Sequence, residues 1–326
     1  MGGGPHRPGL RQALAAARPP AILVAGPTAS GKSALALAVA REFGGVVINA
    51  DSMQVYRELS ILTARPGEAA LAAAPHRLYG VLSAAERCSA GRWRALAGDV
   101  AAETAGRLPV FVGGTGLYLR TLTRGLADIR PVPAPVAAEG AALLARGGPA
   151  ALHAQLRRLD PVMAQRVAPG DSQRVLRAWA VRQGTGRSLA DWQADSPVRD
   201  GWPSLTLALM PPRDALYAAC DNRFRRMVEA GAMEEAQALA ALRLDPSLPA
   251  MRAVGVRELI AASEGRISRG AAIDAAQKAT RRYAKRQTTW IRHQMPEAEI
   301  LTEQFSERIL LKIFNIIRQF LLTAPG

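Results

Sequence analysis

A phosphate-binding loop is the clearest chemical signal in the sequence. Residues 26–33 read Gly-Pro-Thr-Ala-Ser-Gly-Lys-Ser and match the spacing G-x-x-x-x-G-K-S/T. The glycines let backbone N–H groups turn toward a phosphate, and a following helix adds the positive end of its dipole. Lys32 supplies a mobile positive charge, and Ser33 supplies a hydroxyl for Mg²⁺. The loop predicts phosphate binding and leaves open whether the ligand is a nucleotide or another diphosphate.

Two further polar side chains follow apolar runs that predict buried strands. Asp51 comes directly after residues 46–50, where it could act as a general base, hold a metal through water, or cap a helix. Residues 108–112 lead into Gly-Gly-Thr-Gly at 113–116, where an ordinary ATPase strand would end in Asp. These glycines predict a close backbone approach, and Thr115 offers a hydroxyl to a substrate. The missing carboxylate weakens an ATPase interpretation.

These side chains need a sheet to position them. Short apolar runs at 22–24, 46–50, 108–112 and 205–210 predict buried strands, with helix-forming segments between them. This alternation is typical of an α/β fold with a parallel sheet, in which the carboxyl ends of the strands carry the chemistry.

The character of the chain changes after residue 126. Residues 130–135 contain three prolines, which favour an extended linker, and 136–183 are helical in pattern with interruptions at 147–149 and 160–161. We therefore expect a P-loop core at 21–126 and 204–326 with additional C-terminal helices, and an inserted helical domain at 127–203. The leader at 1–20 is predicted to be disordered, and the apolar helix at 309–322 to pack on the core.

The composition points to a long polyanion as a partner. Lys and Arg number 42 against 27 Asp and Glu, and the resulting net charge of +15 exceeds what an enzyme of small anions needs. A composition generally rich in Arg and Ala is the alternative explanation. Two cysteines cannot build a disulfide framework, which favours a reducing compartment such as the cytoplasm. No apolar run is long enough to cross a bilayer, so no membrane association is expected.

A basic helix is predicted at 275–294. Six cations fall within an arc of about 140° at 100° per residue, and no acid lies between Asp274 and Glu297. A solvated helix face usually mixes charge signs, so this stripe predicts contact with a phosphate backbone. Contact of all six with a duplex-like RNA would give a salt slope of about −5 on a log–log plot. The six are Lys278, Arg281, Arg282, Lys285, Arg286 and Arg292.

Two shorter basic segments add to this surface. Residues 222–226 combine amide and basic groups, Arg223 among them, which could face an anion or simply be solvated. Arg252 and Arg257 bracket Gly255, where we expect a second backbone to approach.

Three functions account for parts of this pattern. A small-molecule or nucleotide kinase would use the phosphate loop and Asp51 but leaves the basic helix without a purpose. A transferase that joins a diphosphate compound to a nucleic acid would use all of them. An RNA-binding protein with a regulatory phosphate site would explain the charge but not the placement of Asp51 and Thr115.

Six blocks of the sequence together resemble the tRNA dimethylallyltransferase family, the tRNA isopentenyltransferases of bacteria and organelles. They occur in the family's order and span most of residues 21–295, which makes the match far more specific than one phosphate loop. The blocks are GPTASGKS (26–33), ADSMQVY (50–56), VGGTGLYLRTL (112–122), DSQRVLRA (171–178), MRAVGVRE (251–258) and ATRRYAKRQTTWIR (279–292).

The resemblance implies a reaction. A dimethylallyl group would pass from dimethylallyl diphosphate to N6 of the adenosine just 3′ of the tRNA anticodon, with release of diphosphate. Asp51 would take the amine proton, Thr115 would orient the adenine, and Arg223 would contact the diphosphate. Lys32, with Mg²⁺ held partly through Ser33, would neutralise charge on the departing oxygen. The partners would be the anticodon stem-loop and the prenyl donor, and we expect a monomer.

The family also implies two sets of contacts. The diphosphate would lie against Gly26, Pro27, Thr28, Ala29, Ser30, Gly31, Lys32 and Ser33. A target base flipped out of the anticodon stack would bring RNA onto the inserted domain and the core. These contacts would be Asp51, Ser52, Met53, Gln54, Thr115, Gln173, Arg174, Val175, Leu176, Arg177, Arg252, Gly255, Arg257, Lys278, Arg281, Arg282, Lys285 and Arg286.

The chain departs from the family pattern at three positions. Leu62 stands where the family usually has glycine, so a larger side chain narrows the space at that position. Arg65 stands where the family usually has a lysine, and the positive charge is kept. Ala137 stands where the family often has an arginine, so one expected tRNA contact is missing.

Overall fold

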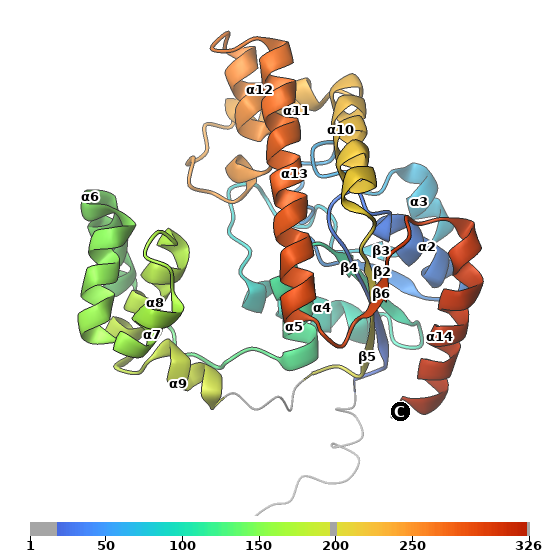
Figure 1. Cartoon of the computed structure of the whole chain (residues 1–326), viewed down its shortest axis with the longest axis horizontal. Coiled ribbons are helices and arrows are strands. Elements are labelled where there is room, and N and C mark those ends of the chain that lie inside the picture. Colours follow the sequence, from blue (N-terminus) through green and yellow to red (C-terminus); the bar gives the residue numbers. More distant parts are fainter. Residues whose placement is uncertain (1–17, 196–200, 325–326) are drawn as a thin grey trace, which may run out of the picture. The chain divides into compact units, whose positions relative to one another are not determined.

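The structure, a computed structural model, describes residues 18–195 and 201–324 and forms two compact units (Figure 1). Among the described residues, the first unit comprises 18–123 and 202–324, and the second comprises 124–195 and 201, where the sequence placed an insertion at 127–203. Most of the predicted disordered leader, residues 1–17, lies outside the described residues. No helix in the described ranges is long and apolar enough to cross a membrane.

A six-stranded parallel sheet lies at the centre of the first unit, which confirms the predicted fold class. Its strand order is β3-β2-β4-β1-β5-β6, and every pair is parallel. The four longer strands match the apolar runs of the sequence; β3 and β6 have only two and three residues and were not predicted. The bounds are β1 (Ala21–Ala25), β2 (Val46–Asn49), β3 (His76–Arg77), β4 (Pro109–Gly113), β5 (Ser204–Leu209) and β6 (Glu299–Leu301).

Helices α2 (Lys32–Glu42) and α14 (Leu310–Thr323) cover one face of the sheet, and Figure 1 shows them side by side. Ile22 and Val24 of β1 point to this face because side chains alternate along a strand. They share an apolar cluster with Leu35, Ile313 and other buried residues of the two helices. The prediction that the C-terminal helix packs on the core is therefore confirmed.

The opposite face of the sheet packs against a larger helical layer. Leu23 and Phe111 join this cluster with Trp93, whose ring stacks on Tyr118 at 4.5 Å between centroids. The Trp93 indole N–H donates to the Asn49 carbonyl at 2.8 Å, which anchors the end of β2. The layer contains α4 (Ala90–Glu103), α5 (Gly116–Arg124), α10 (Arg213–Glu229), α11 (Ala232–Ala241), α12 (Val256–Ser263) and α13 (Arg269–Gln294). The first unit also has three shorter helices, which are α3 (Glu68–Ala73), η2 (Ala250–Arg252) and η3 (Glu307–Ile309).

The second unit is helical, as predicted. It contains α6 (Ala134–Leu159), α7 (Pro161–Arg166), α8 (Ser172–Thr185) and α9 (Leu189–Ala194). Gly148, with φ of +69°, breaks α6 at the predicted interruption. The Asp171 carboxylate caps α8 by accepting from the Arg174 N–H at 3.1 Å.

Helices α6 and α8 approach closely at Gly140. A Cβ on Gly140 would lie 2.7 Å from the Leu176 side chain and 2.9 Å from the Trp179 ring. Val175 lies in the same core and is 0% exposed. The prediction that Val175 contacts RNA is therefore wrong for its side chain, because that side chain has no exposed surface that a ligand could touch.

We expect Gly140→Ala to lower the thermal midpoint of the chain, because the new methyl group meets the Leu176 and Trp179 side chains. Gly98→Ala is the matched control: Gly98 lies inside α4 with nothing within 4 Å of its Cβ position, so the substitution should stabilise by about 0.5–1 kcal/mol. Circular dichroism melts measure both. An equal rise for the two variants would contradict the close packing.

Candidate functional site

Three loops with predicted chemistry leave the sheet at one edge. β4 lies between β2 and β1, so the phosphate loop after β1, the 114–116 turn after β4 and Asp51 after β2 are neighbours. A Cβ on Gly113 would lie 2.1 Å from the Ala50 carbonyl oxygen, which confirms the predicted close backbone approach. The Ser52 N–H donates to the Thr115 hydroxyl at 2.9 Å, so the structure brings the Asp51 and Thr115 segments together.

The phosphate loop is shaped for an anion. Gly31 has φ of +91° and precedes α2 without a side-chain cap, so the first N–H groups of the helix remain for a ligand. The Ser30 hydroxyl is buried and has no hydrogen-bond partner within the described ranges. Lys32 donates only a long bond of 3.4 Å to the Pro27 carbonyl. These groups are the unsatisfied donors that a diphosphate would satisfy.

Burial governs the charge of Lys32. It lowers the pKa of the ammonium to about 8, while the negative charge of Asp51 acts in the opposite direction. Asp51 and Lys32 are thus close enough to influence each other. The structure places Lys32 at a desolvated position where a bound anion would favour its charged form.

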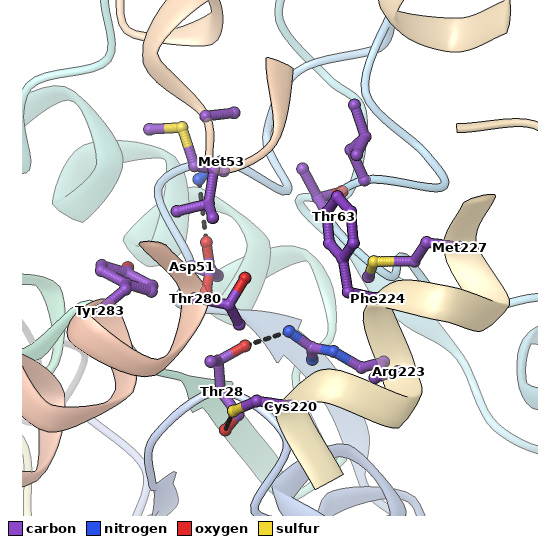
Figure 2. A pocket seen from close by; sticks show the side chains of 13 residues that line it. Thr28, Asp51, Met53, Thr63, Cys220, Arg223, Phe224, Met227, Thr280 and Tyr283 are labelled. Carbon is purple, nitrogen blue, oxygen red and sulfur yellow. Dashed lines mark hydrogen bonds between the residues drawn. The ribbon is translucent and has the colours of Figure 1, made fainter. Parts of the chain in front are cut away.

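Arg223 reaches the phosphate loop from α10. Its Nη2 donates to the Thr28 hydroxyl, as Figure 2 shows, and burial lowers the pKa of its guanidinium. Its Nε is buried without a partner among the described residues. Asn222 and Arg225, by contrast, are exposed and bond each other at 3.0 Å, so of the 222–226 segment these two do not face the loop.

Asp51 is held in a turn rather than at a helix start. Its Oδ1 accepts from the Met53 N–H at 2.9 Å, and the buried Asn49 side chain accepts from the Asp51 N–H at 2.8 Å. The next helix along the described stretch begins only at Glu68, so the helix-cap alternative is wrong. The second carboxylate oxygen, Oδ2, accepts no hydrogen bond from the described part of the protein and is available to a substrate.

Asp51, Thr28 and Arg223 line one cavity of about 60 Å³, and Figure 2 shows their side chains converging on it. Tyr283 of α13 stands beside Asp51; burial and the Asp51 charge both raise the pKa of its phenol, which therefore stays protonated. The cavity thus has a polar end. Its other walls are largely apolar and comprise Met53, Leu62, Phe224, Met227, Ala253 and Val254, with Thr63, Cys220 and Thr280 between them.

Gly255 has a different role from the predicted one. Its φ is +94°, and its Cβ position lies 2.7 Å from the Phe224 ring and 3.2 Å from the Leu62 side chain. Side chains, not a second backbone, therefore come close to it. The Leu62 loop is itself held by Glu235, whose carboxylate accepts from the N–H groups of residues 60–62 at 2.6–2.8 Å.

Several site residues were missed because they lie on the inward face of the basic helix. Thr280 and Tyr283 line the cavity, and the buried Gln287 contacts two of the loops. The signal was the set of polar residues opposite the cationic stripe, which a helical wheel places toward the core. A polar residue on a buried face needs a partner, and here the partners are the loops of the site.

The cationic stripe is divided. Arg281 pairs with Asp221 of α10 at 2.5 and 2.6 Å, which corrects the expectation of six cations without a carboxylate. Arg282 and Arg286 line a hollow of about 460 Å³ together with Arg252 and Arg257. Lys285 and Arg292 line a second hollow of about 180 Å³ together with Arg213, and Lys278 is exposed. The basic surface is therefore two pockets flanking α13 rather than one band.

The other predicted RNA contacts differ in their exposure. Gln173, Arg174 and Arg177 are at least partly exposed on α8 of the second unit, while Leu176 is partly buried in its core. In the first unit the Gln54 amide donates to the Thr63 and Ala64 carbonyls at 2.8 and 3.1 Å. The Gln54 donors thus hold the pocket-lining loop.

The residues at the phosphate loop fit a magnesium ion bound mainly through phosphate. Among the residues described, no group of three His, Cys, Asp or Glu side chains could hold a metal by itself. Mg²⁺ commonly takes one or two protein oxygens and completes its shell with water and substrate phosphates. Ser33 is exposed at the start of α2, next to the unsatisfied loop donors, and meets that need.

Comparison with known proteins identifies related chains. The IPP transferase family matches residues 54–294, and the isopentenyl transferase family matches residues 20–85. A tRNA dimethylallyltransferase of Rhodospirillum rubrum is 56% identical over 316 residues, covering 94% of this chain and 97% of the relative. One from Phenylobacterium zucineum is 51% identical over 307 residues, covering 93% and 97%.

Two solved structures are similar along most of the chain. The full-length tRNA isopentenylpyrophosphate transferase of Bacillus halodurans has a TM-score of 0.67 at 31% identity, covering 93% of this chain and 97% of that one. A eukaryotic dimethylallyltransferase, solved acting on tRNA, has a TM-score of 0.82 at 25% identity, covering 94% and 80%.

The lowered pKa of Lys32 predicts how diphosphate binding depends on pH. Above pH 8 the free protein must take up a proton to present an ammonium, so the Kd for magnesium diphosphate should rise toward about tenfold per pH unit. Lys32→Arg is the control, since a guanidinium does not titrate there. Calorimetry between pH 7 and 9.5 measures the ratio of the two Kd values, in which titration of the ligand cancels. A ratio that stays constant would contradict the desolvated lysine.

Proposed function

The chain belongs to the IPP transferase family of tRNA dimethylallyltransferases, and on that premise we propose that it transfers a dimethylallyl group from dimethylallyl diphosphate to N6 of the adenosine 3′ of the anticodon in tRNA. The observation that carries the proposal is the shared cavity of Thr28, Asp51 and Arg223, with its apolar walls. A kinase would need neither these walls nor the basic pockets beside α13.

The donor diphosphate binds at the phosphate loop. The N–H groups at the start of α2, the Ser30 hydroxyl and the cations of Lys32 and Arg223 surround its oxygens. Because Lys32 and Arg223 are desolvated, their charges act strongly on the oxygen that becomes negative as the C–O bond breaks. Mg²⁺ held partly through Ser33 would supply further charge neutralisation on the diphosphate.

Keeping Lys32 and Arg223 charged costs free energy in the free protein. Desolvation lowers the pKa of both Lys32 and Arg223, which means that the charged forms are less favourable there than in water. The Ser30 hydroxyl is likewise without a partner in the described part of the chain. A diphosphate satisfies all of these groups together, so the site is organised in advance for the negative charge that develops on the leaving oxygen.

The prenyl group occupies the apolar part of the cavity. Phe224 and Met227 of α10 and Leu62 of the 60–62 loop provide its walls. An allylic group gains from leaving water, and a water-poor cavity protects it from hydrolysis as the bond to oxygen weakens.

Asp51 serves as the general base for the adenine amine. An exocyclic amine is a poor nucleophile, so a carboxylate must take its proton during attack. The bond from Met53 N–H fixes one carboxylate oxygen and leaves Oδ2 for the amine. The Thr115 hydroxyl accepts from the Ser52 N–H and donates to the Ser52 hydroxyl, and we assign to this residue the orientation of the base.

The two basic pockets beside α13 hold the RNA backbone. Their six arginines, one lysine and the absence of a carboxylate among the described residues of the smaller one suit phosphate oxygens, and Glu258 is the acid that lines the larger. A base inside the cavity must leave its stack, so the substrate is a loop rather than a paired stem. The anticodon stem-loop meets this requirement.

We propose that the enzyme acts as a monomer. Cys88 and Cys220 are free thiols, which suits a reducing compartment and supports a cytoplasmic enzyme.

The function is tested by incubating the chain with radiolabelled dimethylallyl diphosphate, Mg²⁺ and total tRNA, beside an ATP hydrolysis assay. Label should enter tRNA, and nucleoside digestion should locate it on an adenosine N6 with no ATP consumed. ATP turnover that is independent of label transfer would instead support the kinase.

Asp51→Asn should lower the transfer rate by about 10²–10⁴-fold, because the amide cannot accept the amine proton. The substituted side chain keeps a carbonyl oxygen for the Met53 N–H, so the turn and the affinity for tRNA should be retained. Single-turnover transfer and filter binding measure the two effects. A variant that transfers at the normal rate would remove Asp51 from its role as base.

Replacing Arg282 and Arg286 with glutamine should weaken tRNA binding and flatten its salt dependence by about 0.7–0.9 per lost phosphate contact. Arg281→Gln is the matched control on the same helix, since Arg281 is already paired with Asp221 and should leave the slope unchanged. Binding is measured between 50 and 300 mM salt, roughly the range over which such contacts are screened. Equal slopes for both variants would argue against the larger pocket as an RNA site.

A further inference from the structure

Two buried glutamines lie on the inward face of α13, and they have different partners. Gln277 is 6% exposed and its Nε2 donates to the Asp221 carbonyl of α10 at 3.0 Å. Gln287 is 5% exposed and bonds two loops of the site at once. Its Oε1 accepts from the Thr28 N–H at 2.8 Å, and its Nε2 donates to the Gly114 carbonyl at 2.9 Å.

The fit of Gln287 is tight on the side of the β4 loop. A Cβ on Gly114 would lie 2.0 Å from Nε2 of Gln287, and a Cβ on Gly116 would lie 2.0 Å from the Trp290 ring one turn further along α13. A Cβ at either position would displace the Gln287 amide or the Trp290 ring from where it now lies. The orientation of the Gln287 amide is also determined, because Thr28 N–H can only donate and Gly114 C=O can only accept.

Gln287 therefore joins the two halves of the site. The Thr28 N–H donates to Gln287, and the Thr28 hydroxyl accepts from Arg223 at the diphosphate end. On the other side Gly114 precedes Thr115, which bonds Ser52 next to the base Asp51. One amide thus sets the spacing between the loop that holds the leaving group and the loop that holds the acceptor.

We propose that Gln287 is a positioning residue for the transfer reaction, acting through Thr28 and Gly114; the proposal rests on the function proposed above. It also makes α13 the mechanical link between the basic pockets on its outer face and the reacting groups on its inner face. A displacement of α13 by bound RNA would move both loops together.

The first experiment compares Gln287→Met with Gln277→Met. Methionine is unbranched and of similar length, and each variant removes the hydrogen bonds of a buried side-chain amide, so both should lose thermal stability. Only Gln287→Met should lose the single-turnover transfer rate, by about 10²-fold, since a misplacement of about 1 Å between reacting groups has that effect. The Kd for tRNA should stay within about twofold in both, because the substitutions leave the outer face of α13 unchanged.

A second variant gives a pH signature that a purely structural role would not produce. In Gln287→Glu a protonated carboxyl can still accept from Thr28 N–H and donate to Gly114 C=O, whereas the ionised form cannot donate. The rate relative to the unsubstituted chain should therefore rise as the pH falls, while the ratio for Gln287→Met stays flat. Taking ratios cancels the titration of Asp51 and Lys32 in the unsubstituted enzyme.

The outcomes separate this proposal from the function on which it rests. If the unsubstituted chain transfers no prenyl group to tRNA, both are overturned. If it does, and Gln287→Met transfers as fast as Gln277→Met at a temperature where both are folded, Gln287 has no positioning role. A Gln287→Glu rate ratio that is independent of pH overturns the double hydrogen bond as the cause.

Discussion

The parallel pairing of β4 between β1 and β2 is the constraint on which the site depends. Ala25 pairs with Gly113 and Asn49 with Val112, so the three strands end at nearly the same level. Their loops must then share a small space, and backbone carbonyls come so close that position 113 cannot hold a Cβ. The phosphate loop, Thr115 and Asp51 are neighbours because the register of the sheet leaves them no other place.

Helix α13 carries positive charge on its outer face and packs against the site with its inner face. Its outer face carries cations that would repel one another in isolation. Asp221 neutralises one of them, and four others line two pockets that arginines from α10, η2 and α12 complete. Its inner face uses Thr280, Tyr283 and Gln287 to contact the region of Asp51 and the phosphate loop, so the basic surface outside is coupled by geometry to the cavity inside.

The sequence by itself determined the local chemistry and the class of fold. The loop at 26–33, the four longer strands, the helical segment with its breaks at Gly148 and Pro161, and the choice of Asp51 and Thr115 as candidate site residues all follow from short motifs and patterns. The role of Arg223 came from the resemblance to the family. Such patterns report periodicity, turn chemistry and spacing, which are properties of neighbouring residues. They are silent about which distant residue fills a given space.

The tertiary structure alone decided the rest, because it depends on contacts between residues far apart in the chain. The Arg281–Asp221 pair divides a stripe that looked continuous along the helix. Phe224 and Leu62, and not a second backbone, fill the space at Gly255. Val175 looked like part of an RNA contact until the packing of α6 on α8 buried it. Gln287 joins residues 28 and 114, which lie 259 and 173 positions away in the sequence, a contact that helical periodicity places on the inner face but cannot assign to a partner.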